Sequence, residues 1–419
     1  MVKLKIDHKE VTAEEGTVLM EVIRRQGIEV PSMCYLEGVD HFTSCMVCVV
    51  KDSKNGKIIP SCSLKAEDGM EIVSMDEEIR EARRTALELL LSEHTGDCEA
   101  PCQITCPAHM DIPLMNRLLA EGRFREALEV VKRDIALPSV FGRICPAPCE
   151  GACRRKLVDG AVSICLLKRY AGDHDAGENE PWIPGRAPET GKRVTVVGAG
   201  AAGLAAAYHL SLRGHAVTVV DRNRLAGGSL RKEVKPEQLP PQVLDREIGL
   251  LERSGVTFEL GTEVDAGSFR EIAEKSDATV VATGKGESGA GEWGLPMHAK
   301  GIEADNRTYR VGDTPVFATG SALKPFRMAI RALGQGKEAA FGVDQFLRGE
   351  PVCGEPFLFN SRFGKLVPSE VTEYMKEAVE RSRIEPADLS AGFTMEQVKE
   401  EAARCMRCDC RDLHTCRLR

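Results

Sequence analysis

Cysteine is the residue type whose number and spacing indicate chemistry in this chain. Of its 419 residues, 16 are cysteines, and all but one fall into three groups: four between residues 34 and 62, seven between 98 and 165, and four between 405 and 416. The first residues, MVKLKIDHKEV, contain no apolar signal segment, and no other run of apolar residues approaches membrane-spanning length. We therefore expect a protein of the cytoplasm. In a reducing cytosol, clustered cysteines bind metals or do redox work rather than form structural disulfides. We therefore expect three metal-binding regions, and an ordinary packed thiol at the isolated Cys353.

The first group follows the pattern Cys34-x10-Cys45-x2-Cys48-x13-Cys62. It lies in a compact β-rich segment. VKLKIDHKEVTAEEGTVLMEVIRRQGI predicts a hairpin, an extended turn and a short helix, and GKIIPSC and MEIVSM predict later strands. A close pair with two outlying thiols suits a planar [2Fe–2S] centre, although four cysteines with this spacing also suit zinc.

The residues around these cysteines narrow the choice. PSMCYLEGVDHFTSCMVCVV, followed by GMEIVSM and ARRTALELLLSEH, resembles the amino-terminal ferredoxin module of the large iron–sulfur subunit of complex I. The same module begins many NAD-linked hydrogenases and formate dehydrogenases. The resemblance implies a β-grasp [2Fe–2S] ferredoxin domain over residues 1–77, with Cys34, Cys45, Cys48 and Cys62 as the cluster ligands.

The second group begins with Cys98-x3-Cys102-x3-Cys106 and continues with Cys145-x3-Cys149-x3-Cys153 and Cys165. Between the two runs, LMNRLLAEGRFREALEVVKRD carries apolar residues at helical spacing. Two cysteine-rich loops at the ends of a helical hairpin can close on each other. We therefore expect a helical domain over residues 78–185 that encloses two [4Fe–4S] clusters.

The combination of CPAHMDIP, EALEVV and GRICPAPCEGAC resembles the helical double-cluster domain of the glutamate synthase small subunit and of dihydropyrimidine dehydrogenase. The resemblance implies two ligand sets, Cys106, Cys145 and Cys149 for one cluster and Cys98, Cys102 and Cys153 for the other. The chain departs from the family at Thr95, where a cysteine is usual, and near Lys168, where a carboxylate or amide ligand is usual. Cys165 is the candidate for the second vacancy. His94 is the candidate for the first, since imidazole can bind iron, but it could also merely place a cation at a helix end.

A linker, DHDAGENEPWIPGRAPETGK, precedes a different kind of segment. RVTVVGAGAAGLAAAYHLSLRGHAVTVVDRN has the order strand, glycine turn, helix, strand, with Gly198, Gly200 and Gly203 forming G-x-G-x-x-G. Asp221 ends the second strand, in reach of a ribose hydroxyl. The segments LAGGSLR, which contains Gly228, and TPVFATG, which ends at Gly320, resemble the FAD site of the glutamate synthase small subunit. We therefore expect a truncated Rossmann-like FAD-binding domain over residues 186–350.

Two departures from that family bear on function. Complete members insert a second dinucleotide-binding domain between segments matching VVATGK and PVFATG, but here only 26 residues separate Gly284 from Val311. We therefore expect no NAD(P)H site in this chain. Ser321 also stands where the family has an aspartate that contacts the flavin, so a retained fold that binds no flavin is the alternative.

The last group, in EEAARCMRCDCRDLHTCRLR, follows an amphipathic helical stretch from about Thr394. It contains Cys405, Cys408, Cys410 and Cys416, and the basic Arg404, Arg407 and Arg411 would offset thiolate charge. Zinc and [4Fe–4S] are both admissible, and the other iron–sulfur signatures favour [4Fe–4S]. We expect a short helical, Cys-rich module over residues 351–419 that could dock against another subunit.

The chain has no nucleophile–base arrangement, phosphate loop or zinc-hydrolase motif, and its net charge of -8 gives no reason to expect nucleic acid as a partner. We expect a multidomain α/β and β protein whose cofactors, [2Fe–2S], two or three [4Fe–4S] clusters and FAD, carry electrons.

The leading hypothesis is an electron-transfer subunit of a multisubunit NAD(P)-linked oxidoreductase of hydrogenase or formate dehydrogenase type, with electron bifurcation as an option. Its partners would include a complex I-like subunit that binds NADH and FMN, and ferredoxin. The alternatives are a self-sufficient NAD(P)H-dependent flavoenzyme and an assembly scaffold with a vestigial flavin fold.

Overall fold

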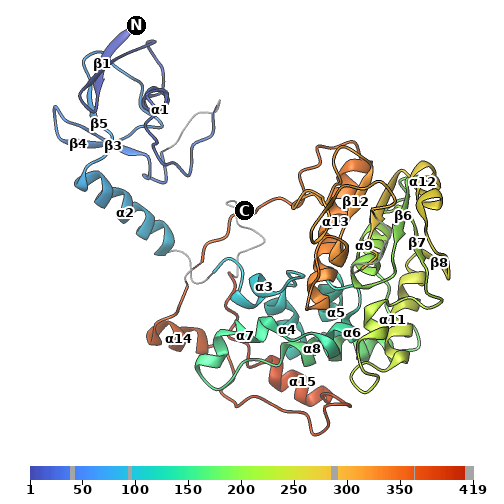
Figure 1. Cartoon of the computed structure of the whole chain (residues 1–419). Coiled ribbons are helices and arrows are strands. Elements are labelled where there is room, and N and C mark those ends of the chain that lie inside the picture. Colours follow the sequence, from blue (N-terminus) through green and yellow to red (C-terminus); the bar gives the residue numbers. More distant parts are fainter. Residues whose placement is uncertain (38–42, 93–96, 285–290, 363, 411–419) are drawn as a thin grey trace. The chain divides into compact units, whose positions relative to one another are not determined.

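The structure is a computed structural model that describes residues 1–37, 43–92, 97–284, 291–362 and 364–410. It divides into two compact units, Met1–Thr95 and Gly96–Arg419 (Figure 1). Among the helices of the described residues, none is long and apolar enough to cross a membrane.

The first unit is a five-stranded mixed sheet with one helix packed on it. Its strands are β1 (Val2–Ile6), β2 (Lys9–Ala13), β3 (Val49–Asp52), β4 (Lys57–Pro60) and β5 (Glu71–Val73), in the order β2-β1-β5-β3-β4. β1 pairs with β2 as an antiparallel hairpin and with β5 in parallel. Alternate residues of β1 are buried and share a core with the apolar face of α1 (Leu19–Arg25). The predicted N-terminal β-sheet domain is confirmed.

Helix α2 (Glu77–Ser92) follows β5 and belongs to the first unit, although the predicted domain boundary fell at residue 77. Arg83 attaches this helix to the sheet. Its buried guanidinium donates hydrogen bonds to Val49 O at 2.7 Å and to Ser74 O at 3.2 Å. These bonds satisfy carbonyl groups at the end of the sheet that the strand pairing leaves free.

The first half of the second unit is helical. Its helices are α3 (Pro101–Thr105), α4 (Ile112–Ala120), α5 (Phe124–Lys132), α6 (Pro138–Ile144), α7 (Pro148–Gly151) and α8 (Ile164–Ala176), with a 3-10 turn, η1, at Arg154–Leu157. The Asp111 carboxylate caps α4 by accepting a hydrogen bond from Leu114 N at 3.1 Å. α4 and α5 form the predicted helical hairpin and share one core with α6 and α8. The predicted helical domain is confirmed.

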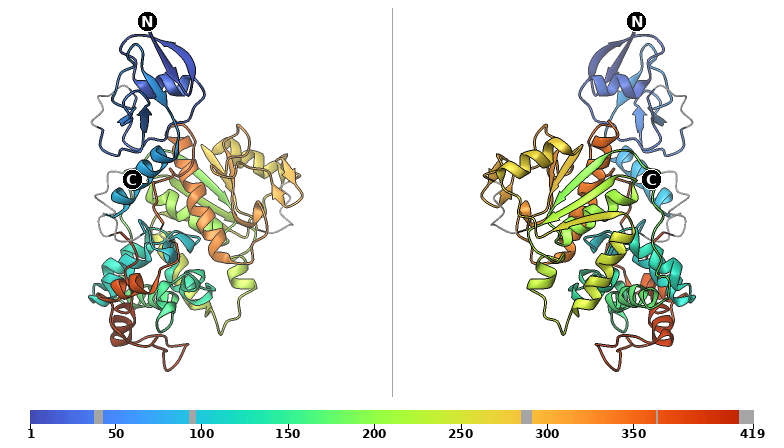
Figure 2. Two further views of the ribbon diagram at one scale, coloured as in Figure 1. Left: turned by 90° about the vertical axis from the view of Figure 1, so that its left-hand side faces the viewer. Right: turned by 90° about the vertical axis from the view of Figure 1, so that its right-hand side faces the viewer.

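The second half of this unit is built on a parallel sheet. Its strands are β6 (Arg193–Val197), β7 (Ala216–Asp221), β8 (Val256–Leu260), β9 (Ala278–Val281) and β12 (Val316–Ala318), in the order β12-β9-β6-β7-β8. Helices pack on both faces (Figures 1 and 2). Val196 and Val280 belong to the core that includes α9 (Ala201–Leu212), whereas Val197 and Val281 pack with Phe269 of α12 (Ala266–Lys275). This arrangement confirms a Rossmann-like fragment.

Several further elements complete the sheet half. They are α10 (Ser229–Lys232), α11 (Pro241–Arg253), the 3-10 turn η2 (Gly320–Ala322), the long α13 (Ala329–Leu347), and a short hairpin of β10 (Met297–His298) and β11 (Gly301–Ile302). This hairpin is the only regular structure that the described residues form between β9 and β12. α13 packs directly on α9, and Gly336 permits the approach because a Cβ there would lie 2.2 Å from Ala202 O.

The C-terminal part contains α14 (Pro368–Met375) and α15 (Met395–Ala402). α15 packs against α4 and α8, and its Val398 and Ala402 belong to the core of the helical half. Residues 351–419 were predicted to form a module of their own. Within the described residues, this segment instead shares a core with the helical half.

Candidate metal-binding and dinucleotide-binding sites

The four cysteines of the first unit lie near one another in the loops beside α1 and β3. Cys45, Cys48 and Cys62 are buried and Cys34 is exposed, and the Cys34 and Cys45 sulfur atoms are 3.4 Å apart. Burial opposes ionisation of Cys34, but hydrogen bonds from the Cys45 and Ser44 backbone outweigh it and lower its pKa to about 7. Burial and the neighbouring Cys48 raise the pKa of Cys62 to about 12. The site therefore offers four clustered sulfur donors, the set that a [2Fe–2S] centre requires.

A second group of thiols lies where α3, α6, α7 and α8 meet. Its members are Cys106, Cys145, Cys149 and Cys165, and the side chain of Lys168 interacts electrostatically with all four. A hydrogen bond with Cys165 and burial raise the pKa of Cys145. A hydrogen bond with Cys145 lowers the pKa of Cys165, but its bond with Cys149 and its burial raise it to about 12. Cys165 is thus hydrogen-bonded to both Cys145 and Cys149, and with Cys106 these thiols fit the donor set of one [4Fe–4S] cluster.

Lys168 is buried beside this second group, with its Nζ 3.9 Å from the Cys165 sulfur. Burial lowers the pKa of a lysine, but the neighbouring cysteines, with Cys165 first, reverse this effect and raise the pKa of Lys168. Lys168 therefore stays a cation and cannot bind iron. Its charge offsets the negative charge that four thiolates would bring.

A third group of thiols lines one cavity in the helical half. The cavity wall includes Cys102, Cys153, Cys405 and Cys408, together with Asn116 and Arg154. Burial, followed by the neighbouring thiols, raises the pKa of Cys102. Burial also raises the pKa of Cys405, although a hydrogen bond with Asn116 acts in the opposite direction. Cys102 and Cys153 come from the predicted double-cluster domain, whereas Cys405 and Cys408 come from the C-terminal segment.

The remaining predicted ligands lie elsewhere or outside the described residues. The Cys98 sulfur accepts a hydrogen bond from Ser361 N at 3.3 Å, and the Cys98 carbonyl accepts one from Cys410 N at 3.2 Å. His94 and Cys416 lie outside the described residues. In the part of the chain that the structure describes, no three or more His, Cys, Asp or Glu side chains are placed to bind a single metal ion. The three groups are thus sets of neighbouring thiols, and each ligand role stays a prediction.

Cys353 corrects one expectation from the sequence. It was predicted to be a packed thiol, but it is exposed, and its sulfur lies 3.3 Å from Gln345 Nε2. The prediction was wrong because it rested on the average behaviour of cysteine, whereas this residue follows the exposed end of α13.

The glycine turn between β6 and α9 has the shape that a pyrophosphate needs. Gly198 has a φ of +113°, and a Cβ there would lie 2.4 Å from Ala282 O. A Cβ on Gly203 would lie 1.9 Å from Gly198 O. Close packing therefore leaves no room for a side chain at Gly198 or at Gly203. A Cβ on Gly200 would meet no atom within 4 Å. The open position at the amino end of α9 is where a phosphate can approach the backbone.

The carboxyl ends of neighbouring strands complete this candidate site. Gly228 and Gly320 both have positive φ, and their missing side chains let the chain approach Gly200 and Ala202 closely. Thr283 follows β9 and Thr319 follows β12, and among the described residues neither buried hydroxyl has a hydrogen-bond partner. Orphaned polar atoms at the carboxyl edge of a parallel sheet fit a polar ligand there.

In the structure, the Asp221 carboxylate is hydrogen-bonded to the backbone of the glycine turn. Its Oδ2 accepts a hydrogen bond from Ala199 N at 2.7 Å, and its Oδ1 accepts one from Asn223 N at 2.7 Å. The predicted contact between Asp221 and a ribose hydroxyl stays a prediction.

Three family models match parts of the chain. Residues 1–77 match a 2Fe-2S iron-sulfur cluster binding domain, residues 67–180 match dihydropyrimidine dehydrogenase domain II with a 4Fe-4S cluster, and residues 193–232 match an FAD dependent oxidoreductase. The chain therefore combines a 2Fe-2S domain, a 4Fe-4S domain and part of an FAD-dependent oxidoreductase fold. The sequence-based assignment of these three cofactor classes is confirmed.

Curated relatives are similar over about half of the chain. The beta subunit of the NADPH-Fe(3+) oxidoreductase of Geobacter sulfurreducens is 37% identical over 214 residues, which cover 50% of this chain and 30% of that subunit. The beta subunit of the NADP(+)-dependent formate dehydrogenase of Moorella thermoacetica is 36% identical over 207 residues, covering 44% and 29%. The glutamate synthase [NADPH] small chain of Bacillus subtilis is 39% identical over 201 residues, covering 45% and 40%. The chain thus spans less than half the length of these relatives.

Among solved structures, the NAD+-reducing [NiFe]-hydrogenase in the H2-reduced state matches 29% of this chain at 29% identity, with a TM-score of 0.22. That score is too low to support a structural argument. The sequence matches show that about half of the chain is similar to subunits of these oxidoreductases. The predicted likeness to glutamate synthase small chains and to formate dehydrogenase subunits is confirmed at this level.

Proposed function

We propose that this chain is an electron-transfer subunit of a multisubunit NAD(P)-linked oxidoreductase, of hydrogenase or formate dehydrogenase type. Support comes from three groups of clustered thiols and a dinucleotide site in one chain. The relatives named as beta subunits and small chains support a role within a larger enzyme. A cytoplasmic location and an optional role in electron bifurcation stay predictions.

The proposed cofactors follow from the donor sets. Cys34, Cys45, Cys48 and Cys62 would hold a [2Fe–2S] cluster, and Cys106, Cys145, Cys149 and Cys165 would hold a [4Fe–4S] cluster. Gly198, Gly200 and Gly203 would receive the FAD pyrophosphate, and Thr283 and Thr319 would offer hydroxyls to the same ligand. FAD exchanges electron pairs with hydride donors, whereas iron–sulfur clusters carry single electrons.

One observation carries the proposal: α13 contacts both the dinucleotide turn and the loop that begins with Cys106. On one side, Gly336 of α13 lies against Ala202 O of α9. On the other side, a Cβ on Gly334 would lie 2.2 Å from Pro107 O, and Lys337 Nζ donates to Ala108 O at 3.1 Å. α13 therefore packs against both the dinucleotide turn and the loop after Cys106, an arrangement that supports electron passage between the two proposed sites.

The external electron source is proposed to lie in another subunit. Among the described residues, the segment between β9 and β12 forms only the β10–β11 hairpin, whereas a nucleotide-binding domain needs strands and helices of its own. A complex I-like subunit that binds NADH and FMN is the proposed partner, with ferredoxin as a second one. This partner assignment rests on the resemblance of the first unit.

An anaerobic cofactor inventory tests the proposal. Purified protein should contain FAD, together with iron and acid-labile sulfide in the amounts of one [2Fe–2S] and at least two [4Fe–4S] clusters per chain. Clusters without flavin would contradict the proposal and favour the alternative, an assembly scaffold with a vestigial flavin fold. Zinc in place of iron and sulfide would remove the electron-transfer role.

A further inference from the structure

Two distant parts of the second unit bring four cysteines to one cavity. Cys102 lies on α3 and Cys153 directly before η1, whereas Cys405 and Cys408 follow α15. We propose that Cys405 and Cys408 complete the [4Fe–4S] site begun by Cys102 and Cys153, in place of Cys98 and His94. The inference rests on the proposed iron–sulfur function of the helical half. It makes the C-terminal segment part of the cluster site instead of a separate module.

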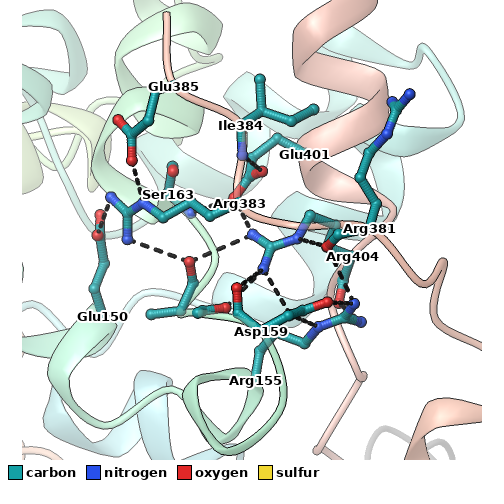
Figure 3. A network of polar contacts seen from close by, with 12 residues as sticks. Glu150, Arg155, Asp159, Ser163, Arg381, Arg383, Ile384, Glu385, Glu401 and Arg404 are labelled. Carbon is teal, nitrogen blue, oxygen red and sulfur yellow. Dashed lines mark hydrogen bonds and ion pairs between the residues drawn. The ribbon is translucent and has the colours of Figure 1, made fainter.

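A buried polar network fixes the two halves of this site against each other (Figure 3). Arg155, two residues after Cys153, donates to the carbonyl of Arg404 at 2.8 Å, and Arg404 directly precedes Cys405. Both guanidinium groups also bind the Asp159 carboxylate, Arg155 at 2.6 Å and Arg404 at 2.9 Å. Both arginine side chains are 0% exposed. An unpaired charge would be very costly at such a position, so the network holds the backbone at Cys153 and at Cys405 in one arrangement.

Glu401 extends this network to the second thiol group. Its carboxylate, 0% exposed, accepts hydrogen bonds from Arg404 Nη1 at 2.7 Å, from Ser163 N at 2.8 Å and from Ile384 N at 2.8 Å. Ser163 directly precedes α8, on which Cys165 lies. The loop that leads from one thiol group to the other is therefore attached to α15.

A second connection joins the ends of the same two segments. Asp97 and Asp409 form a parallel β-bridge, Cys410 N donates to Cys98 O at 3.2 Å, and Arg117 Nη1 donates to Asp409 Oδ2 at 2.9 Å. Cys98 and Cys410 thus pair through their backbones. Among the described residues, neither is part of the cavity wall, and the Cys98 sulfur is engaged by Ser361 N at 3.3 Å.

The chemistry of the cavity suits a bound cluster. Its four cysteines are buried or half-buried, and the polar residues of the cavity wall are Asn116, Arg154 and Arg155. Burial and the neighbouring Cys405 raise the pKa of Cys408, whereas Arg154 lowers it. Bound iron would supply the positive charge that makes four adjacent thiolates favourable. Arg154 and Asn116 would remain as hydrogen-bond donors to the cluster sulfurs.

The proposal is tested with full-length protein purified or reconstituted without oxygen. Cys405→Ala and Cys408→Ala should each lose the iron and sulfide of one [4Fe–4S] cluster per chain, or convert that cluster to a three-iron form. Cys98→Ala and the exposed Cys353→Ala are matched controls and should keep the full content. Low-temperature paramagnetic resonance of the reduced protein should show the [2Fe–2S] signal unchanged in all four variants.

The opposite pattern would overturn the proposal. Full cluster content in Cys405→Ala, with a cluster lost in Cys98→Ala, would show that the set with Cys98 is the correct one. One zinc per chain that disappears in Cys405→Ala, with iron unchanged, would also contradict it. A wild-type protein without any [4Fe–4S] cluster would instead refute the proposed function itself, so the two failures are distinguishable.

A measurement on the wild-type chain covers the case in which the variants fold poorly. Alkylation followed by mass spectrometry should find Cys102, Cys153, Cys405 and Cys408 protected together in the intact protein. After iron is removed by oxidation and a chelator, all four should become reactive, while Cys353 reacts throughout. Early alkylation of Cys405 and Cys408 in the iron-loaded protein would overturn the proposal.

Discussion

Lys168 is the residue with the clearest expected effect on redox properties. It is 3% exposed, and its ammonium lies beside the thiol group of Cys106, Cys145, Cys149 and Cys165. A fixed positive charge near a cluster stabilises the added electron and so raises the reduction potential. Unit charges about 7 Å apart interact by about 2 kcal/mol at an effective dielectric constant of about 20. For one electron, 2 kcal/mol corresponds to about 90 mV.

We expect Lys168→Met to lower the midpoint potential of one [4Fe–4S] cluster by about 90 mV. The measurement is a potentiometric titration followed by paramagnetic resonance. Lys132→Met is the matched control, because Lys132 is also a buried lysine in the helical half, and its leading electrostatic neighbours are Glu247 and Asp175. An equal shift in both variants, or none in Lys168→Met, would show that Lys168 has only a packing role.

At the scale of elements, the turn between β6 and α9 is expected to decide flavin binding. In Gly203→Ala the added Cβ would lie 1.9 Å from Gly198 O, so the turn must open. We expect FAD affinity to fall at least tenfold, which is about 1.4 kcal/mol. Gly249→Ala in α11 is the control, since its Cβ meets no atom within 4 Å and alanine favours a helix by about 1 kcal/mol. Fluorescence titration of the flavin-free protein measures both, and unchanged affinity in Gly203→Ala would argue against FAD at this turn.

The contact between α11 and α6 should depend on pH. The buried Glu247 of α11 accepts hydrogen bonds from Ser139 N at 3.0 Å and Val140 N at 2.9 Å, at the start of α6. Burial and the nearby Asp173 raise the pKa of Glu247 to about 7, although those two hydrogen bonds and Lys132 act in the opposite direction. The folded protein therefore holds this proton more tightly than the unfolded chain does. Its contribution to stability is present below about pH 4.5 and is lost as the pH rises toward 7.

Glu247→Gln should remove this dependence. The loss in the wild-type protein between pH 4.5 and 7 is at most about 3 kcal/mol, because each pKa unit is worth 1.36 kcal/mol. The thermal midpoint of the wild-type protein should therefore fall more steeply with rising pH over this range than that of the variant. Parallel curves would show that Glu247 titrates normally.

Much of the element-scale structure follows from the sequence. The alternating Val2, Leu4 and Ile6 predict a strand, and the glycine turn at Gly198 predicts a strand–turn–helix unit, because these signals are local. The grouping of Cys405 with Cys153 was not predictable. It depends on the contact between Arg155 and Arg404, which are 249 residues apart in sequence, and no local pattern encodes such a pairing. The exposure of Cys353 was not predicted for a related reason, because the burial of a side chain depends on which distant residues pack over it.

At the scale of the whole molecule, the chain is proposed to carry electrons without accepting hydride from a nicotinamide nucleotide itself. Helix α13 contacts both the dinucleotide turn and the loop that begins with Cys106, and electrons are proposed to pass between these two sites. The first unit adds a separate donor set of four cysteines. On this account, reduction by NADH or NADPH requires a partner subunit.

Anaerobic reduction of the isolated chain tests this claim directly. Dithionite should bleach the flavin absorbance and produce the paramagnetic signals of the reduced clusters. NADH and NADPH, each added in excess, should leave both unchanged over minutes and should support no reduction of an artificial dye. Rapid bleaching of the flavin by either nucleotide, without any partner subunit, would contradict the account and establish a self-sufficient flavoenzyme.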